Sequence, residues 1–142
     1  MSDDATLTFV PPSDQGGASR SLLVVDDEPS IREITRLVLE SAGYRVCCAA
    51  DGREAMKLLA EQLFDLVITD MLMPGSDGLE LLSVVKHSRA NTRVLVMSGG
   101  GMIGMSDYLK VAKKLGAHGV LEKPFSAECL LASVAELLKQ AD

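Results

Sequence analysis

The chain has 142 residues and a formal net charge of −6, with 47% hydrophobic and 24% charged residues. This length suits one globular domain with a sizeable core, and the acidic balance argues against a nucleic-acid surface, because phosphate contacts need clustered Lys and Arg. No apolar run approaches the length of a membrane span, and the acidic N-terminus lacks the pattern of a signal peptide.

The first part of the chain and the cysteines have simple interpretations. Residues 1–20 combine Pro, Gly, Ser and Asp, which predicts a flexible leader before a folded domain at 21–142. Cys47, Cys48 and Cys129 are odd in number and lie in apolar patterns, so we expect buried free thiols. Free thiols are typical of a reducing compartment, and the cytoplasm is the expected location.

Five strand-like segments alternate with five helix-like segments. The expected strands are 21–26, 44–49, the part of 64–74 that ends at Asp70, 93–97 and 118–122. The expected helices are 29–42, a segment capped by Asp51 that runs to about 62, one that follows Gly78, 106–115 and 127–139. Short connections between alternating strands and helices are typical of a doubly wound α/β fold with a parallel sheet.

Helix signals support this division of the chain. Pro29 opens the first helix, and Ile31, Ile34 and Val38 recur on what we expect to be its buried face. Gly43 is placed to end that helix. In the stretch 64–74 a near-continuous apolar run predicts a strand that is covered on both faces.

Polar residues follow four of the five expected strands. The first strand ends at Asp26 and Asp27, the third at Asp70, the fourth at Ser98 and the fifth at Lys123. An Asp at a strand end commonly does no more than cap a turn. Here, however, the carboxyl ends of parallel strands meet at one edge of the sheet, where ligands bind in such folds. We therefore expect these side chains to gather in one site.

A site of this composition has a specific chemistry. At ~4.5 Å and an effective dielectric constant of ~20, each pair of carboxylates repels by roughly 3–4 kcal/mol. Such a cluster raises a pKa or holds a divalent cation, and an all-oxygen donor set favours Mg²⁺ or Mn²⁺. With Lys123 and Ser98 the site suits a phosphoryl group, and the ionised Asp70 carboxylate is a competent nucleophile toward phosphorus without a general base.

These motifs, from about 21 to 139, resemble the receiver domain of response regulators. The resemblance implies a flavodoxin-like fold of the chemotaxis-receiver type, a five-stranded parallel sheet of order 2-1-3-4-5 with five helices. It implies that Asp70 accepts phosphate from a histidine kinase or phosphotransfer protein, and that Ser98 and Lys123 bind the phosphoryl oxygens. Asp26, Asp27, Asp70 and the Leu72 carbonyl would hold Mg²⁺, with Mn²⁺ as the alternative. The Lys123–Pro124 peptide bond would be cis.

The chain departs from the family pattern at several positions. Val120 stands where the family usually has Tyr or Phe, so rotation of a ring there cannot be the readout. Leu72 and Gly100 stand at positions that flank the path of the hydrolytic water, and neither can orient water, so we expect at most slow autophosphatase activity and no other enzyme activity. The run 99–101 with Gly104 predicts a loop that moves on phosphorylation, or else merely a tolerant loop.

The residues at the strand ends are consistent with three functions to different degrees. Because no residues follow Asp142, we expect a single-domain switch that signals by protein contact, unless the chain is a piece of a longer regulator. Its kinase-facing rim would include Pro29 and Ile31, and its output surface the fourth helix, fifth strand and fifth helix. A Mg²⁺-dependent aspartyl-phosphate phosphohydrolase would need its nucleophile on the first strand, and a flavin-binding module would need a phosphate cradle where Asp26 and Asp27 stand.

Overall fold

The computed structural model describes residues 20–70, 72–73, 76–88, 91–99 and 105–141. Residues 1–19 of the expected leader, together with Gly100, Gly101 and Gly104, lie outside the described residues. The elements in chain order are β1 (Ser21–Val25), α1 (Pro29–Ser41), β2 (Arg45–Ala49), α2 (Gly52–Glu61), β3 (Leu66–Asp70), β4 (Leu72–Met73), β5 (Ser76–Asp77), α3 (Gly78–Ser88), β6 (Arg93–Ser98), α4 (Met105–Lys114), β7 (Gly119–Glu122) and α5 (Ala127–Ala141).

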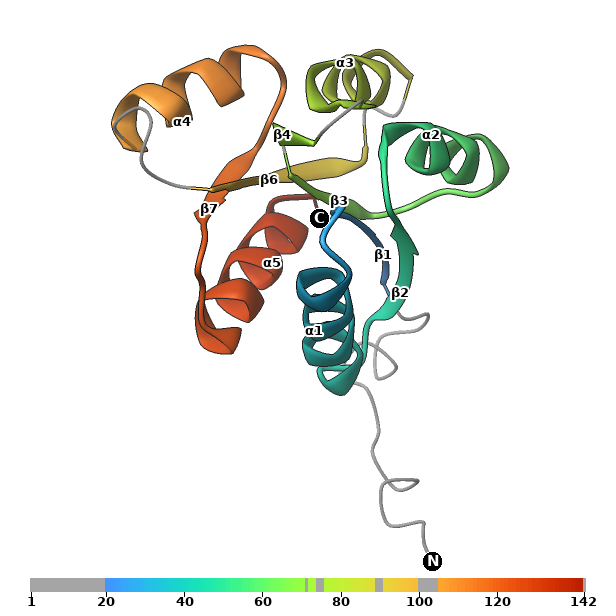
Figure 1. Ribbon diagram of the computed structural model, residues 1–142, viewed down its shortest axis with the longest axis vertical. Helices are drawn as coiled ribbons and strands as arrows, with labels where there is room; N and C mark the ends of the chain where they lie inside the picture. Colours follow the sequence, from blue (N-terminus) through green and yellow to red (C-terminus); the bar gives the residue numbers. More distant parts are fainter. Residues whose placement is uncertain (1–19, 71, 74–75, 89–90, 100–104, 142) are drawn as a thin grey trace, which may run out of the picture.

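The main sheet confirms the predicted fold class. Its five parallel strands lie in the order β2-β1-β3-β6-β7 (Figure 1), and since these are the five predicted strands in chain order, the sheet has the expected order 2-1-3-4-5. The sequence did not predict β4 and β5, which pair antiparallel beside the sheet. Strands of two residues are too short to show a period in the sequence.

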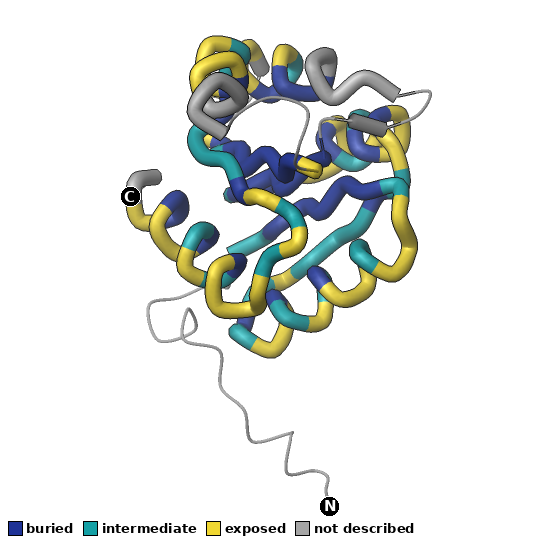
Figure 2. The backbone as a smooth tube through the Cα atoms, turned by 60° about the vertical axis from the view of Figure 1, so that its left-hand side comes forward, coloured by how far each residue is buried: buried dark blue, intermediate teal, exposed yellow. Residues whose placement is uncertain are grey.

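The sheet has a helical layer on each face (Figure 1), and β1, β3 and β6 are almost entirely buried between the layers (Figure 2). Alternate residues of the strands contribute to the two cores. On one face α2, α3 and α4 pack on a core that includes Leu23, Val25, Val67, Leu82, Val94 and Ala112. On the other face α1 and α5 pack on a core that includes Leu22, Val24, Leu39, Ile68, Leu95 and Val134. Both faces of the sheet are therefore covered by apolar side chains, and polar groups can gather at the ends of the strands.

The register of α1 differs from the prediction. The helix buries Thr35 and Leu39, whereas Ile34, which we expected in the core with Ile31 and Val38, is 56% exposed. Ile31 and Val38 are half-buried. The apolar stripe of α1 is thus wider than the surface on which the helix packs, and part of it faces outward.

Helix ends follow the expected signals. Gly43 adopts φ 98° directly after α1, a conformation that favours glycine. Asp51 caps α2 by accepting a hydrogen bond from the Glu54 N–H at 2.9 Å, and the Glu54 carboxylate accepts one in return from the Ala50 N–H at 2.7 Å. This reciprocal pair fixes the start of α2.

The expectation of buried cysteines is wrong in detail. All three thiols are free, but Cys47 and Cys48 are half-buried and Cys129 is exposed. Cys47 and Cys48 lie on β2, the outer strand of the sheet, which has a neighbour on one side only. Cys129 lies in the first turn of α5, whose buried side is formed instead by residues such as Leu130 and Val134. Within the described residues, no helix is long and apolar enough to cross a bilayer.

Candidate functional site

Three carboxylates from two neighbouring strands meet at the carboxyl edge of the sheet. Because Val25 of β1 pairs with Thr69 of β3, the residues that come next, Asp26 and Asp70, lie side by side. One carboxylate oxygen from each of Asp26, Asp27 and Asp70 lies within 4.8 Å of the others. Asp26 is fully buried and Asp70 is 7% exposed, so the sheet holds two acids away from bulk water.

The Asp26 carboxylate is fixed at both oxygens. Oδ1 accepts a hydrogen bond from the Glu28 N–H at 2.9 Å, and Oδ2 accepts one from Lys123 Nζ at 2.8 Å. On α1, Arg32 Nη1 donates to the Asp26 carbonyl at 2.7 Å. The orientation of Asp26 is therefore set by the first turn of α1 as well as by β1.

Lys123 links the two strands that carry the acids. Its Nζ lies 2.8 Å from Asp26 Oδ2 and 2.9 Å from Asp70 Oδ2. Burial of the amine alone would lower its pKa, but the hydrogen bonds to Asp26 and Asp70 outweigh burial, and the pKa of Lys123 is raised above its ordinary value. Lys123 is therefore a fixed positive charge at the site.

The position of Lys123 depends on the chain that surrounds it. Its N–H donates to the Ser98 carbonyl at 2.7 Å, which ties the residue after β7 to the end of β6. The following Lys123–Pro124 peptide bond is cis, as the resemblance implied.

The remaining predicted residues are placed by the backbone. Ser98 is the last residue of β6 and is 8% exposed, so it lies at the same edge as Asp70. Leu72 lies in β4, two residues beyond Asp70. The roles of the Ser98 hydroxyl and the Leu72 carbonyl stay predictions.

Sequence reasoning missed three contributors to the site. Glu28 Oε1 lies 3.6 Å from Lys123 Nζ and adds a further carboxylate at the rim, while Arg32 supports Asp26. The Thr69 hydroxyl donates to the Asp70 carbonyl at 3.0 Å. Glu28 contacts a lysine that is distant in the sequence, and Arg32 and Thr69 contact backbone carbonyls, so no spacing in the sequence identifies these three contacts.

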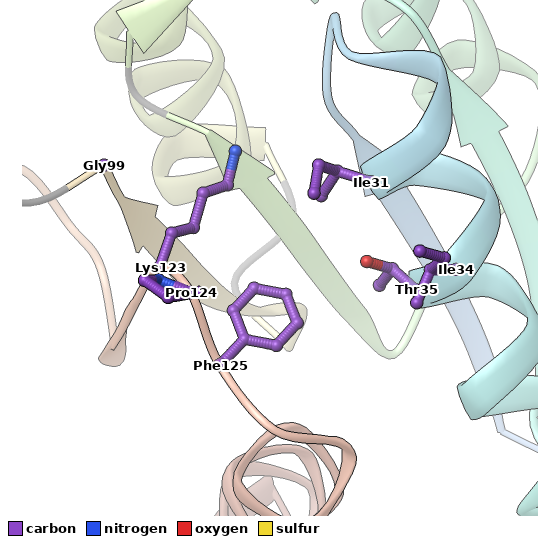
Figure 3. A pocket seen from close by; sticks show the side chains of 7 residues that line it. All are labelled: Ile31, Ile34, Thr35, Gly99, Lys123, Pro124 and Phe125. Carbon is purple, nitrogen blue, oxygen red and sulfur yellow. The ribbon is translucent and has the colours of Figure 1, made fainter.

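A cavity of about 320 Å³ opens beside Lys123, between α1 and the segment after β7 (Figure 3). It is lined mainly by apolar side chains, including Ile31, Ile34 and Phe125. The Thr35 hydroxyl faces the Phe125 ring across it and, among the described residues, has no hydrogen-bond partner. The outward part of α1 thus borders the site.

The donor atoms of the cluster fit a hard divalent cation. Asp26, Asp27 and Asp70 offer carboxylate oxygens that can converge on one ion, and among the described residues no His or Cys belongs to this group. Oxygen ligands of this kind suit Mg²⁺ better than Zn²⁺. A single ammonium leaves three carboxylates incompletely neutralised, which favours a bound cation further.

Comparisons with known proteins agree with this geometry. The family model "Response regulator receiver domain" matches residues 22–135. Sporulation initiation phosphotransferase F of Bacillus subtilis (strain 168) is 33% identical over 120 residues, which make up 84% of this chain and 94% of that protein. The transcriptional regulatory protein FixJ of Bradyrhizobium diazoefficiens is 34% identical over 121 residues, 85% of this chain and 58% of FixJ.

Solved structures give the same result. The chemotaxis response regulator CheY4 of Vibrio cholerae superposes with a TM-score of 0.77 at 34% sequence identity, covering 84% of this chain and 99% of that one. The chain thus spans nearly all of some relatives and little more than half of FixJ. The family model, the relatives and the five-stranded parallel sheet agree, and the chain belongs to the response regulator receiver domain family.

Proposed function

We propose that the chain is a phosphorylation switch of a two-component phosphorelay, in which Asp70 accepts a phosphoryl group from a histidine kinase or phosphotransfer protein. The observation that carries the proposal is the pair of hydrogen bonds from Lys123 Nζ to Asp26 and Asp70, at 2.8 Å and 2.9 Å. Through these contacts the Lys123 ammonium holds together two acids that are distant in the sequence, at the carboxyl ends of the strands.

The side chains support phosphoryl transfer to a carboxylate. A carboxylate oxygen of Asp70 forms the new O–P bond while the N–P bond of a phosphohistidine breaks, and the imidazole keeps that electron pair. Lys123 is placed to offset the charge of the phosphoryl oxygens, and the Ser98 hydroxyl is proposed to donate to one of them. Asp70 needs no base, because an ionised carboxylate has no proton to lose.

A bound divalent metal ion is part of the same proposal. Asp26, Asp27, Asp70 and the Leu72 carbonyl would hold Mg²⁺, with Mn²⁺ as a substitute. When bound, Mg²⁺ supplies positive charge to the phosphoryl oxygens and a template that keeps open positions for them. In its absence the Asp26 and Asp70 carboxylates depend on Lys123 for compensation.

Two surfaces are proposed for partners. A phosphodonor protein must reach Asp70, and its proposed docking rim is Pro29 and Ile31 with the apolar cavity beside Lys123, the residue that is hydrogen-bonded to Asp70. The output surface comprises α4, β7 and α5, on which Val111 is 52% exposed. We infer that the chain acts as a single-domain regulator. We also propose a cytoplasmic location, which the three free thiols support.

Labelling with a small phosphodonor tests the proposal without knowledge of the kinase. Incubation with acetyl phosphate and Mg²⁺ should add the mass of one phosphoryl group, measured on the intact protein, and Asp70→Asn should remove this addition. Asp51→Asn is the matched control, because Asp51 is an exposed aspartate whose capping role Asn can replace. Labelling that persists in Asp70→Asn, or no labelling of the wild type, would refute the assignment.

Hydrolysis of the acyl phosphate should be slow. Leu72 and Gly100 cannot orient an attacking water, so we expect phosphorylated Asp70 to persist for minutes or longer in the same intact-mass assay once acetyl phosphate is removed. A half-life of seconds would contradict this expectation, and steady turnover of a generic phosphomonoester would indicate a phosphohydrolase instead.

A further inference from the structure

A second cavity, of about 320 Å³, lies at the sheet edge opposite Asp70. It is formed where α3 and α4 end, at the beginnings of β6 and β7. Its lining includes Lys86 from α3, Lys113 from α4, and Thr92 and His118, which lie just before β6 and β7. Among the described residues that line this cavity there is no carboxylate, and the charged ones are both lysines.

The two lysines are not engaged by acids. Lys86 and Lys113 are exposed, and within the described part of the chain neither side-chain amine makes a hydrogen bond or an ion pair. The stem of Lys86 packs on Gly116, where a Cβ would lie 3.2 Å from Lys86 Cδ. In a chain of net charge −6, two such ammonium groups at one cavity are a local reversal of charge.

The simplest alternative is that Lys113 only compensates the carbonyls at the end of α4. Backbone groups already satisfy those carbonyls. The Ala117 N–H donates to the Ala112 carbonyl at 2.9 Å, and the Gly116 N–H donates to the Lys113 carbonyl at 3.1 Å. This closed turn leaves the lysine ammonium free to bind another group.

His118 supplies a directed donor. Its Nδ1 accepts a hydrogen bond from the Val94 N–H at 3.0 Å, so the neutral ring carries its proton on Nε2. Burial, with the nearby charge of Arg93, lowers the pKa of His118 and keeps the ring in this neutral form near pH 7. Nδ1 is therefore not available to a ligand, and the Nε2–H is the one ring donor that His118 adds to a lining that also contains the two lysines.

We propose that this cavity binds a small oxyanion, the phosphate or carboxylate group of a small molecule, through Lys86, Lys113 and His118. The donor set has no acceptor counterpart that would suit a cation, and Arg or Lys with N–H donors is the usual chemistry of oxyanion recognition. The site is separate from the phosphoacceptor. It lies at the opposite end of β7, since His118 precedes that strand and Lys123 follows it.

The chain contains two histidines, which makes NMR titration a direct test. Pyrophosphate and, separately, citrate are added to the full chain without Mg²⁺ at constant ionic strength, and the ring signals of His118 and His87 are followed from pH 5 to 8. The expected result is a saturable change at His118 with a rise of about 0.5 in its pKa, because a bound anion favours the imidazolium form. His87 is the internal control, since it lies on α3 outside the cavity lining.

Substitutions distinguish specific binding of the anion in the cavity from a general effect of added ions. Lys86→Gln with Lys113→Gln should weaken binding about tenfold or more, whereas Lys57→Gln, which removes an exposed lysine from α2, should leave it unchanged. Both cavity lysines are exposed, so the double variant should fold. No saturation at His118, an equal change at His87, or binding that survives the double variant would overturn the proposal. Tighter saturation by pyrophosphate assigns phosphate ligands, and tighter saturation by citrate assigns carboxylates.

Discussion

At the residue scale, the carboxylate cluster favours binding of a cation but lowers the stability of the metal-free chain. Asp27 has an oxygen within 4.8 Å of oxygens of both Asp26 and Asp70, and Lys123 is hydrogen-bonded to those two. Two unit charges at this distance repel by roughly 3 kcal/mol at an effective dielectric constant of ~20. Asp27 is half-buried, so solvent screening and the Lys123 charge reduce the part that affects folding to about 1 kcal/mol.

Asp27→Asn should therefore make the metal-free chain more stable. We expect the free energy of unfolding, measured by urea denaturation with a chelator at pH 7, to rise by about 1 kcal/mol because one repelling charge is lost. Mg²⁺ affinity, measured by calorimetry, should fall in the same variant. Glu61→Gln, which neutralises an exposed acid at the end of α2, is the control and should change neither quantity. A less stable metal-free Asp27→Asn would contradict repulsion as the dominant effect.

Some residue roles were open to sequence reasoning and others were not. Asp26, Asp70 and Lys123 could be predicted because parallel strands bring their carboxyl ends to one edge. Glu28 and Thr69 were missed, since their contacts depend on side-chain directions and on the exact course of the turn after β1. The α/β pattern predicts where strands end but not how side chains turn beyond them.

At the scale of elements, the turn between α4 and β7 depends on one glycine. Gly116 adopts φ 112°, donates to the Lys113 carbonyl at 3.1 Å and lies against the side chain of Lys86. A residue with a Cβ is strained in this conformation and would contact Lys86 Cδ at 3.2 Å.

Gly116→Ala should lower the free energy of unfolding by about 1–2 kcal/mol, measured by urea denaturation. Gly99→Ala is the matched control, because a Cβ at Gly99 meets nothing within 4 Å, and we expect a change below about 0.5 kcal/mol. Equal losses in the two variants would contradict backbone strain at Gly116 as the cause, because the effect of Ala on the unfolded chain alone is stabilising.

The sequence predicted where helices begin more reliably than which side of a helix is buried. Pro29 at the start of α1 and Asp51 at the cap of α2 are local signals, and both are confirmed. The prediction of the buried side of α1 was wrong, because three residues with large apolar side chains were assumed to face the core. These are Ile31, Ile34 and Val38. Burial of a helix is decided by its neighbours, and the neighbours of α1 are distant in the sequence.

At the scale of the whole molecule, the fold and the positions of the strand-end residues were predictable for the same reason. Five apolar strands with short connections to helices admit few arrangements, and the handedness of parallel crossovers leaves fewer. Residues at strand ends are then fixed relative to one another without any knowledge of side-chain packing. The β4 and β5 pair was not predictable, because a two-residue ladder has no period of its own.

Binding of Mg²⁺ should stabilise the entire fold, because the three acids come from β1 and β3 and meet only when the sheet is formed. A ligand that binds only the folded state adds about 2.7 kcal/mol at a hundredfold excess over its Kd. We expect the midpoint of urea unfolding to rise with Mg²⁺ in the wild type but hardly in Asp27→Asn. NaCl at equal ionic strength is the control, and a similar rise with NaCl would indicate screening alone.

The division of labour between strands and helices also has a consequence for the choice of partners. Asp26, Asp70 and Lys123 lie at strand ends and perform the proposed chemistry, while the exposed parts of α1 and α4 carry residues such as Ile34 and Val111. Because the proposed reactive groups and the proposed partner surfaces share no residue, substitutions at Ile34 or Val111 should change which proteins bind without changing the reactivity of Asp70.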